Sequence, residues 1–299
     1  MAQFRVNIDE KYHLLGNEYI IDDNVANMVI ITGMQEHSRR YEWFCKQLNN
    51  AGISCYVLDH FGQGENAKSE DDLQKWPKDA WYMMVKALYL KVKELKEEGK
   101  PVYLMGHSMG SFAVQTYLEE YPNTVDKAII MGSNGPDVPL YMMANMIATL
   151  TVTKKKWDKP SKLLTSLSLG GYSKAIKNRR TDLDWLSYNQ DNVDKYIADP
   201  YCGHTNTCGF FKEFLKGMNK IYRKNKTMNV SKDEHILIVS GSEDPVGKNK
   251  KGVVNLFNMY QKLGVLDVDI ILYDHARHEI LNEDIKEKVV SDILAFIHK

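Results

Sequence analysis

The strongest constraint on the fold is one short segment, Gly106-His107-Ser108-Met109-Gly110. The apolar residues 102–105 before it have the length and composition of a buried parallel strand. Residues 111–121 after it form an apolar helical pattern that ends at Pro122. Strand, Gly-x-Ser-x-Gly and helix together are typical of a nucleophile elbow, in which a strained turn exposes the serine oxygen and glycines relieve crowding. The alternative is a glycine-rich turn with an incidental serine.

Short apolar runs alternate with helical patterns along most of the chain, which predicts an α/β protein with a mostly parallel sheet. The expected strands are residues 4–8, 19–21, 28–31, 53–58, 102–105, 127–131, 235–240 and 268–273. A long charged helix is expected at 80–98. The alternation stops between residues 136 and 228, where helical patterns rich in Met and aromatic residues replace it. We therefore expect a core made of residues 1–135 and 229–299, with a helical cap insertion at 136–228.

The composition of the chain indicates which binding partners and which cellular compartment to expect. Lys+Arg and Asp+Glu both number 39, so the net charge of +0 gives no reason to expect binding to nucleic acid. The four cysteines lack metal-ligand spacing, so no metal is expected; Cys202 and Cys208 could meet in one loop, but reduced thiols are expected. The first residues lack the apolar core of a signal peptide and no run has the length of a membrane span, which predicts a cytoplasmic protein.

A serine nucleophile needs a base and a group that orients the base, and these follow in the order serine, acid, histidine in folds with this elbow. Asp244 comes just after the expected strand 235–240, with Glu243 as the alternative acid or Asp244 as a simple helix cap. After the last expected strand, His275 lies close to the strand end, whereas His278 lies further into the loop. We expect His278 to be the base because it can reach inward to Ser108.

Acyl transfer also requires an oxyanion hole, for which backbone N–H groups suffice. The residue after the nucleophile, Met109, gives one N–H, and an early strand-to-helix loop gives the second, which points to Met34. The cap insertion contains an apolar set that forms either its own core or a wall for a substrate chain. The members expected to bind substrate are Met142, Met143, Met146 and Phe210. Three lysines, 154–156, predict a solvated face or a transient contact with an anionic membrane surface.

These segments together resemble the α/β-hydrolase branch that contains lysophospholipases, monoacylglycerol lipases and serine aminopeptidases. Residues 33–41 are similar to its oxyanion loop, residues 59–64 match its Asp-x-x-Gly-x-Gly turn, and residues 106–110 match its elbow. Asp244 and His278 fall at the positions of its acid and base.

The resemblance extends to residues 277–279 and 282–283 near the end of the chain, and to residues 184–187 and 199–200 in the cap. Two positions differ from the family pattern. Thr32 stands where the family usually has histidine, and Asn66 where a serine often closes the glycine turn. Neither difference removes a catalytic atom, but Thr32 affects the loop that holds the oxyanion.

The resemblance implies an α/β-hydrolase fold with a mostly parallel eight-stranded sheet, helices on both faces and a helical cap over the active site. It also implies hydrolysis of small-molecule acyl esters without a cofactor, with monoacylglycerols or lysophospholipids as the expected substrates. Two alternatives stay open. One is an aminopeptidase, in which cap acids such as Asp182, Asp184, Asp191 and Asp194 would hold a free amino terminus. The other is a non-catalytic binding protein of the same fold; no oligomeric state is predicted.

Overall fold

The computed structural model describes residues 1–299 and contains one eight-stranded sheet with the order β1-β2-β4-β3-β5-β6-β7-β8. Its strands are β1 (Ala2–Asn7), β2 (His13–Tyr19), β3 (Ala26–Ile31), β4 (Ile53–Leu58), β5 (Val102–His107), β6 (Lys127–Met131), β7 (His235–Gly241) and β8 (Asp267–Tyr273). β2 pairs antiparallel with both β1 and β4, and all other neighbours pair parallel. The predicted α/β class with a mostly parallel sheet is confirmed.

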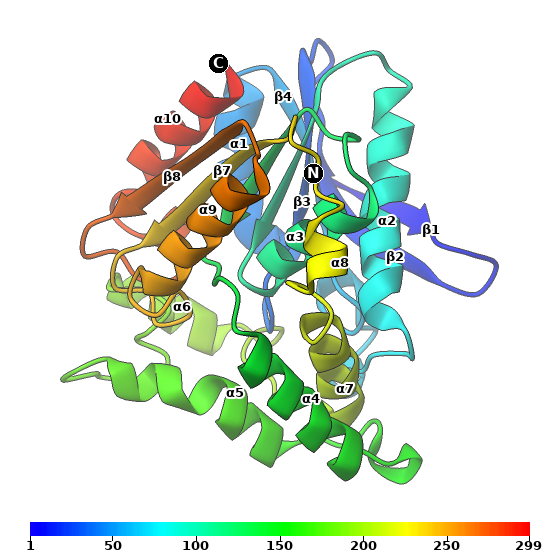
Figure 1. Ribbon diagram of the computed structural model, residues 1–299, viewed down its shortest axis with the longest axis vertical. Coiled ribbons are helices and arrows are strands. Elements are labelled where there is room, and N and C mark those ends of the chain that lie inside the picture. Colours follow the sequence, from blue (N-terminus) through cyan, green and yellow to red (C-terminus); the bar gives the residue numbers. More distant parts are fainter.

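Helices cover both faces of this sheet because alternate strand residues point to opposite sides. The helices of the core are α1 (Glu42–Asn50), α2 (Ala80–Lys96), α3 (Met109–Glu120), α9 (Lys251–Leu263) and α10 (Lys286–Ile297). Phe44 of α1 and Ile293 of α10 share one buried cluster with Ile30 of β3. Trp81 of α2 and Leu256 of α9 belong to the larger cluster on the other face. Figure 1 shows α1 and α10 on one side of the sheet and α2, α3 and α9 on the other.

Between β6 and β7 the chain is helical, and we call residues 136–228 the cap segment. It contains α4 (Val138–Thr151), α5 (Lys162–Ala175), α6 (Gln190–Ala198), α7 (Cys208–Met218) and α8 (Lys224–Thr227). Its only β pairing is the isolated bridge between Pro160 and Thr207. In Figure 1, α4, α5 and α7 lie together at one end of the sheet. That this segment is a separate domain stays a prediction.

Short 3-10 helices complete the connections. They are Ser38–Tyr41, Gly64–Asn66, Glu70–Asp72, Lys154–Lys156 and Ile280–Asn282. None of the helices combines the length and the apolar character needed to cross a membrane. All four cysteines are free and buried.

The second strand lies elsewhere than predicted. We expected residues 19–21, but β2 covers His13–Tyr19 and ends where the predicted strand begins. Its sequence, HLLGNEY, has no continuous apolar run, and its inner position between β1 and β4 defines it instead. Gly16 allows the close approach to β4, since a Cβ there would lie 2.2 Å from the Val57 oxygen.

Candidate active site

Ser108 occupies the sharp turn between β5 and α3. Its backbone has φ 53° and ψ −121°, a strained conformation for a residue with a side chain. A Cβ on Gly106 would lie 2.2 Å from the Gly110 oxygen, and one on Gly110 would lie 2.4 Å from the Ile31 oxygen. The crowding inferred from the sequence is therefore present, and only glycine fits at both positions.

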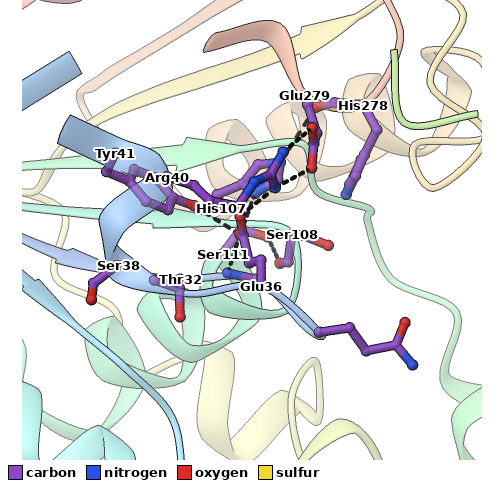
Figure 2. A network of polar contacts seen from close by, with 12 residues as sticks. Thr32, Glu36, Ser38, Arg40, Tyr41, His107, Ser108, Ser111, His278 and Glu279 are labelled. Atoms are coloured by element: carbon purple, nitrogen blue, oxygen red, sulfur yellow. Dashed lines mark hydrogen bonds and ion pairs between the residues drawn. The ribbon is translucent and has the colours of Figure 1, made fainter. Parts of the chain in front are cut away.

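Asp244 and His278 meet at the carboxyl ends of β7 and β8. His278 Nδ1 lies 2.9 Å from Asp244 Oδ2, and the two residues are 1% and 0% exposed. Asp244 Oδ1 accepts the Val246 N–H at 2.9 Å, so the second oxygen also has a partner. His278 and Ser108 line the same pocket, and Figure 2 shows the His278 ring extending toward Ser108.

The competing residues lie outside this pocket. The His275 side chain is 89% exposed, and its Nδ1 lies 3.1 Å from Glu243 Oε1. His275 also has a positive φ of 61°, which turns the loop between β8 and His278. The two alternatives considered from the sequence, His275 and Glu243, thus pair with each other at the surface.

The early loop after β3 approaches the serine closely. A Cβ on Gly33 would lie 3.1 Å from the Cβ of Ser108, so the loop needs glycine there. The Met34 N–H donates no hydrogen bond within the protein. Met109 is the first residue of α3, where helix N–H groups lack intrahelical acceptors and carry partial positive charge. Both methionines line the pocket that Ser108 also lines, and their role as oxyanion donors stays a prediction.

A buried network of charged residues connects the elbow, the loop after β3 and the loop that carries His278 (Figure 2). Glu36 Oε1 is 3.0 Å from His107 Nδ1 and accepts the Gly33 N–H and the Tyr41 hydroxyl. Arg40 donates to Glu36 Oε2 at 3.1 Å and reaches both oxygens of Glu279, at 2.6 and 2.8 Å. His107 Nε2 lies 3.3 Å from the backbone oxygen of His278.

The network favours the charged form of each member. Burial alone would raise the pKa of Glu36, but the neighbouring His107 and Arg40 lower it overall. Burial acts to lower the pKa of His107, yet Glu36 raises it above the ordinary value. The pKa of Glu279 is lowered because Arg40 outweighs the effect of burial. A charged His107 donates from both ring nitrogens, to Glu36 and to the His278 carbonyl.

The sequence analysis did not identify this network as functional. Its residues occur in the quoted motifs: Glu36 and Arg40 in residues 33–41, His107 inside the elbow, and Glu279 next to the expected base. The sequence did contain a signal for the network: titratable residues occur close to Met34, next to Ser108 and next to His278. The network links the elbow, the loop at residues 33–41 and the loop that carries His278.

The pocket around Ser108 is mostly apolar and has a volume of about 80 Å³. Its apolar walls are Met34, Met109, Phe112, Leu169, Tyr172, Trp185, Leu186, Tyr196, Phe214 and Val246. The Trp185 ring lies 5.1 Å from the His278 ring and covers the side of the imidazole. Sequence reasoning found Met34 and Met109 only as amide donors and missed the other walls, because their pocket-facing side depends on tertiary packing.

The four residues expected to bind substrate do not line this pocket, which corrects the prediction. Met142, Met143 and Met146 are more than half exposed on α4, at 55%, 53% and 57%. Phe210 is fully buried and contacts Trp76, with ring centroids 4.5 Å apart. Helical periodicity could place the three methionines on one helix and Phe210 on another, but it could not show which side of either helix faces the serine.

The two departures from the family pattern have different consequences. Thr32 places its hydroxyl in a buried position without a hydrogen-bond partner, and its carbonyl lies 2.6 Å from His60 Nε2. Asn66 exchanges hydrogen bonds with the Leu15 backbone and donates to the Asp59 oxygen, so it holds the glycine turn against β2. Neither Thr32 nor Asn66 forms a hydrogen bond with Ser108.

One further group offers potential metal ligands. His37, Asp199 and Cys202 place ligand atoms within 4.8 Å of one another outside the catalytic pocket. A 2.8 Å hydrogen bond between His37 Nε2 and Asp199 Oδ2 already accounts for two of them. This contact ties the loop at 33–41 to the cap segment.

The sheet topology and this arrangement define an α/β hydrolase. The family model described as serine aminopeptidase, S33, matches residues 22–285, so the chain belongs to that family.

Comparisons with relatives indicate an esterase-like or lipase-like hydrolase. The chain is 24% identical over 284 residues to a monoglyceride lipase homolog of Monkeypox virus, covering 91% of this chain and 89% of that protein. It is 23% identical to the phospholipase YtpA of Bacillus subtilis, covering 92% and 96%. A carboxyl esterase from Bacillus coagulans, solved with glycerol, superposes with a TM-score of 0.90 at 24% identity, covering 100% of this chain and 98% of that one. The structural likeness confirms the predicted fold.

Proposed function

We propose that this protein is a serine carboxylester hydrolase that acts on single-chain acyl lipids through Ser108, His278 and Asp244. The observation that carries the proposal is the buried 2.9 Å contact between His278 and Asp244 in the pocket that Ser108 lines. The apolar walls of that pocket favour an acyl chain over a polar one. The lipase and phospholipase names of distant relatives agree with this substrate class.

The proposed reaction follows from the positions of the residues. Ser108 Oγ attacks the ester carbonyl while His278 accepts its proton, and Asp244 stabilises the imidazolium. The Met34 and Met109 N–H groups donate to the oxyanion that develops on the carbonyl oxygen. His278 then protonates the leaving alcohol, and water activated by His278 releases the acyl group from Ser108. The chain supplies every group used in these steps.

The contacts of the cap acids argue against an aminopeptidase. Asp184 accepts hydrogen bonds from the Arg180 N–H and the Thr181 hydroxyl, and Asp194 pairs with Arg180. No aspartate lines the pocket, and its two carboxylates, Glu36 and Glu279, are paired with His107 and Arg40. A free amino terminus would find no uncompensated carboxylate beside Ser108.

We also propose a transient contact between the cap segment and an anionic membrane surface. Its support is a set of exposed apolar side chains on α4 and α5 close in sequence to lysines 154–156. The set comprises Leu140, Met142, Met143, Met146, Leu150, Leu163 and Leu167. Apolar side chains with neighbouring lysines are suited to an interface between hydrocarbon and negative headgroups.

Labelling with a fluorophosphonate probe tests the proposed nucleophile. We expect the wild-type protein to be labelled and to hydrolyse p-nitrophenyl butyrate, and Ser108→Ala to lose both reactions. Loss of a triad nucleophile typically lowers kcat by about a millionfold. Ester hydrolysis by a folded Ser108→Ala protein within tenfold of wild type would refute the assignment. Faster turnover of an aminoacyl anilide than of the ester would favour the aminopeptidase, and no labelling of wild type would favour a binding protein.

A further inference from the structure

A polar groove opens beside the catalytic pocket along helix α5. Its volume is about 670 Å³, and it shares Gln35, Leu169 and Trp185 with the catalytic pocket. Gln35 directly follows Met34 of the proposed oxyanion hole, and the Trp185 ring lies 5.1 Å from the His278 ring. The groove therefore begins at the side of the pocket where His278 lies.

Helix α5 presents one polar face to this groove. The lining residues recur every three or four positions, which places them on one side of the helix. They are Lys162, Thr165, Ser166, Leu169, Gly170, Ser173 and Lys174. The rise of an α-helix separates the Cα atoms of Lys162 and Lys174 by about 18 Å, so the two ammonium groups stand near opposite ends of the groove.

The groove contains more positive than negative side chains. Arg179 lies 3.3 Å from Asp182, the one carboxylate in the lining, and Ser173 also donates to that carboxylate. The side-chain ammonium groups of Lys162 and Lys174, which both line the groove, take part in none of the side-chain hydrogen bonds or ion pairs of the protein. The groove is therefore left with two uncompensated positive charges.

We infer that this groove binds the leaving-group side of the substrate and that the leaving group carries a phosphate, as in a lysophospholipid. The inference rests on the proposed function. As the ester C–O bond breaks, the proton taken from Ser108 passes from His278 to the alcohol oxygen, so the leaving group must lie beside His278. The groove begins at that position and offers ammonium and hydroxyl donors to phosphate oxygens.

The acyl chain and the headgroup would then occupy different surfaces. The apolar pocket lined by Phe112, Phe214 and Val246 takes the chain, and the groove takes the phosphate. A monoacylglycerol releases uncharged glycerol, which gains no Coulomb attraction from Lys162 or Lys174. The lysines therefore select between two substrates that the acyl pocket accepts equally.

Two soluble esters that differ only in the phosphate test this inference: 1-hexanoylglycerol and 1-hexanoylglycerol 3-phosphate. We expect wild type to show a severalfold higher kcat/KM for the phosphate ester at low salt. The lysine nearer the phosphate contributes about threefold, and the other adds attraction over a Debye length of about 30 Å at about 10 mM salt. The preference should fall to within twofold in Lys162→Gln/Lys174→Gln and in 0.5 M NaCl, because salt screens exposed charges. Lys195→Gln/Lys224→Gln removes two exposed lysines of the cap segment that lie outside both the groove and the proposed membrane contact, so it is the matched control and should keep the preference.

The outcomes separate the groove from the catalytic assignment. Three results would overturn the proposed phosphate site: equal kcat/KM for the two esters, a preference that survives Lys162→Gln/Lys174→Gln, or an equal loss of preference in Lys195→Gln/Lys224→Gln. If wild type hydrolyses 1-hexanoylglycerol and reacts with fluorophosphonate, the proposed function stands in each of those cases. Hydrolysis of neither ester, together with no labelling of Ser108, would overturn both.

Discussion

Replacing Glu36 with glutamine removes one negative charge from the centre of the buried network and leaves the side-chain shape unchanged. Glu36 accepts from Gly33, Tyr41, His107 and Arg40 and is 4% exposed. Arg40 keeps its two contacts with Glu279, but His107 loses its only carboxylate partner. Removing one partner of a buried ion pair typically lowers the free energy of unfolding by about 3–5 kcal/mol. We therefore expect Glu36→Gln to lose about 3 kcal/mol at pH 6, or about 6 °C in Tm.

The loss should depend on pH in a defined direction. Because the pKa of Glu36 is lowered, its contribution is present above the unfolded value of about 4.5 and is lost as the pH falls through the folded value. Because the pKa of His107 is raised, its contribution is complete below about 6.5 and is lost as the pH rises through the folded value. The pair thus stabilises the fold most between about pH 4.5 and 6.5. The difference between wild type and variant should be smaller at pH 9 than at pH 6.

The esterase activity of Glu36→Gln tests whether Glu36 positions the loop that carries the Met34 amide. Glu36 holds the Gly33 N–H, one residue before the Met34 amide. Removing an oxyanion donor outright costs about 100- to 1,000-fold in kcat, so loosening its loop should cost about tenfold, with little change in KM. Urea unfolding at pH 6 and pH 9, with p-nitrophenyl butyrate kinetics, measures both effects.

Glu213→Gln is the matched control, because Glu213 is also 4% exposed but lies on α7 beside Lys216. Burial raises the pKa of Glu213, so neutralising it should cost less than about 1 kcal/mol. A Glu36→Gln protein that loses under 1 kcal/mol at pH 6, or equal amounts at pH 6 and pH 9, would contradict the charged pair. Unchanged kcat would contradict the link to the oxyanion loop.

Two further predictions concern the base and the cap segment. His278→Ala should lower kcat/KM for p-nitrophenyl butyrate by at least 1,000-fold, while the exposed His275→Ala should stay within twofold of wild type; the reverse pattern would make His275 the base. Binding to vesicles containing anionic lipid, measured by sedimentation, should fall severalfold in Lys154→Gln/Lys155→Gln/Lys156→Gln, and equal binding to neutral and anionic vesicles would contradict the proposed membrane contact.

Features that depend on local sequence were predictable. The strands β3, β5 and β6 contain continuous apolar runs, and seven of the eight strands largely overlap the segments predicted for them. Ser108 could be singled out because its turn imposes glycine at fixed offsets on both sides. His278 could be preferred over His275 because two extra loop residues allow the chain to turn back toward the sheet.

Features that depend on tertiary packing were not predictable in the same way. Trp185 and Tyr172 come together beside His278 only through the path of the cap segment, and no periodicity indicates which of its many aromatic residues does so. Charged residues such as Glu36 and Arg40 are rarely buried unless they are paired, and the sequence does not show their partners. Glu36 is buried and Arg40 is largely covered because Glu279, 239 residues from Arg40, supplies the matching carboxylate.

Different parts of the cap segment make very different numbers of contacts with the core. This difference affects which residues can change substrate specificity without disturbing the triad residues. Residues 184–192 are fixed to the His278 loop: Arg277 donates to the Asp184 and Ser187 carbonyls, and Glu279 accepts from Asn192. Glu283 reinforces this by accepting from the Ser187 hydroxyl and the Tyr188 N–H. Substitutions here would disturb the base itself.

Helix α5 makes fewer stabilising contacts than residues 184–192. Leu164 is its only buried residue, and Gly170 and Gly171 lower its intrinsic helix stability. Segments with little buried apolar surface open at low free-energy cost, so we expect α5 to open more easily than the segment at residues 184–192. Helix α5 also carries both lysines of the proposed phosphate groove. Changes on α5 can therefore alter which ester reaches Ser108 while leaving the Glu36 network and the His278–Asp244 contact intact.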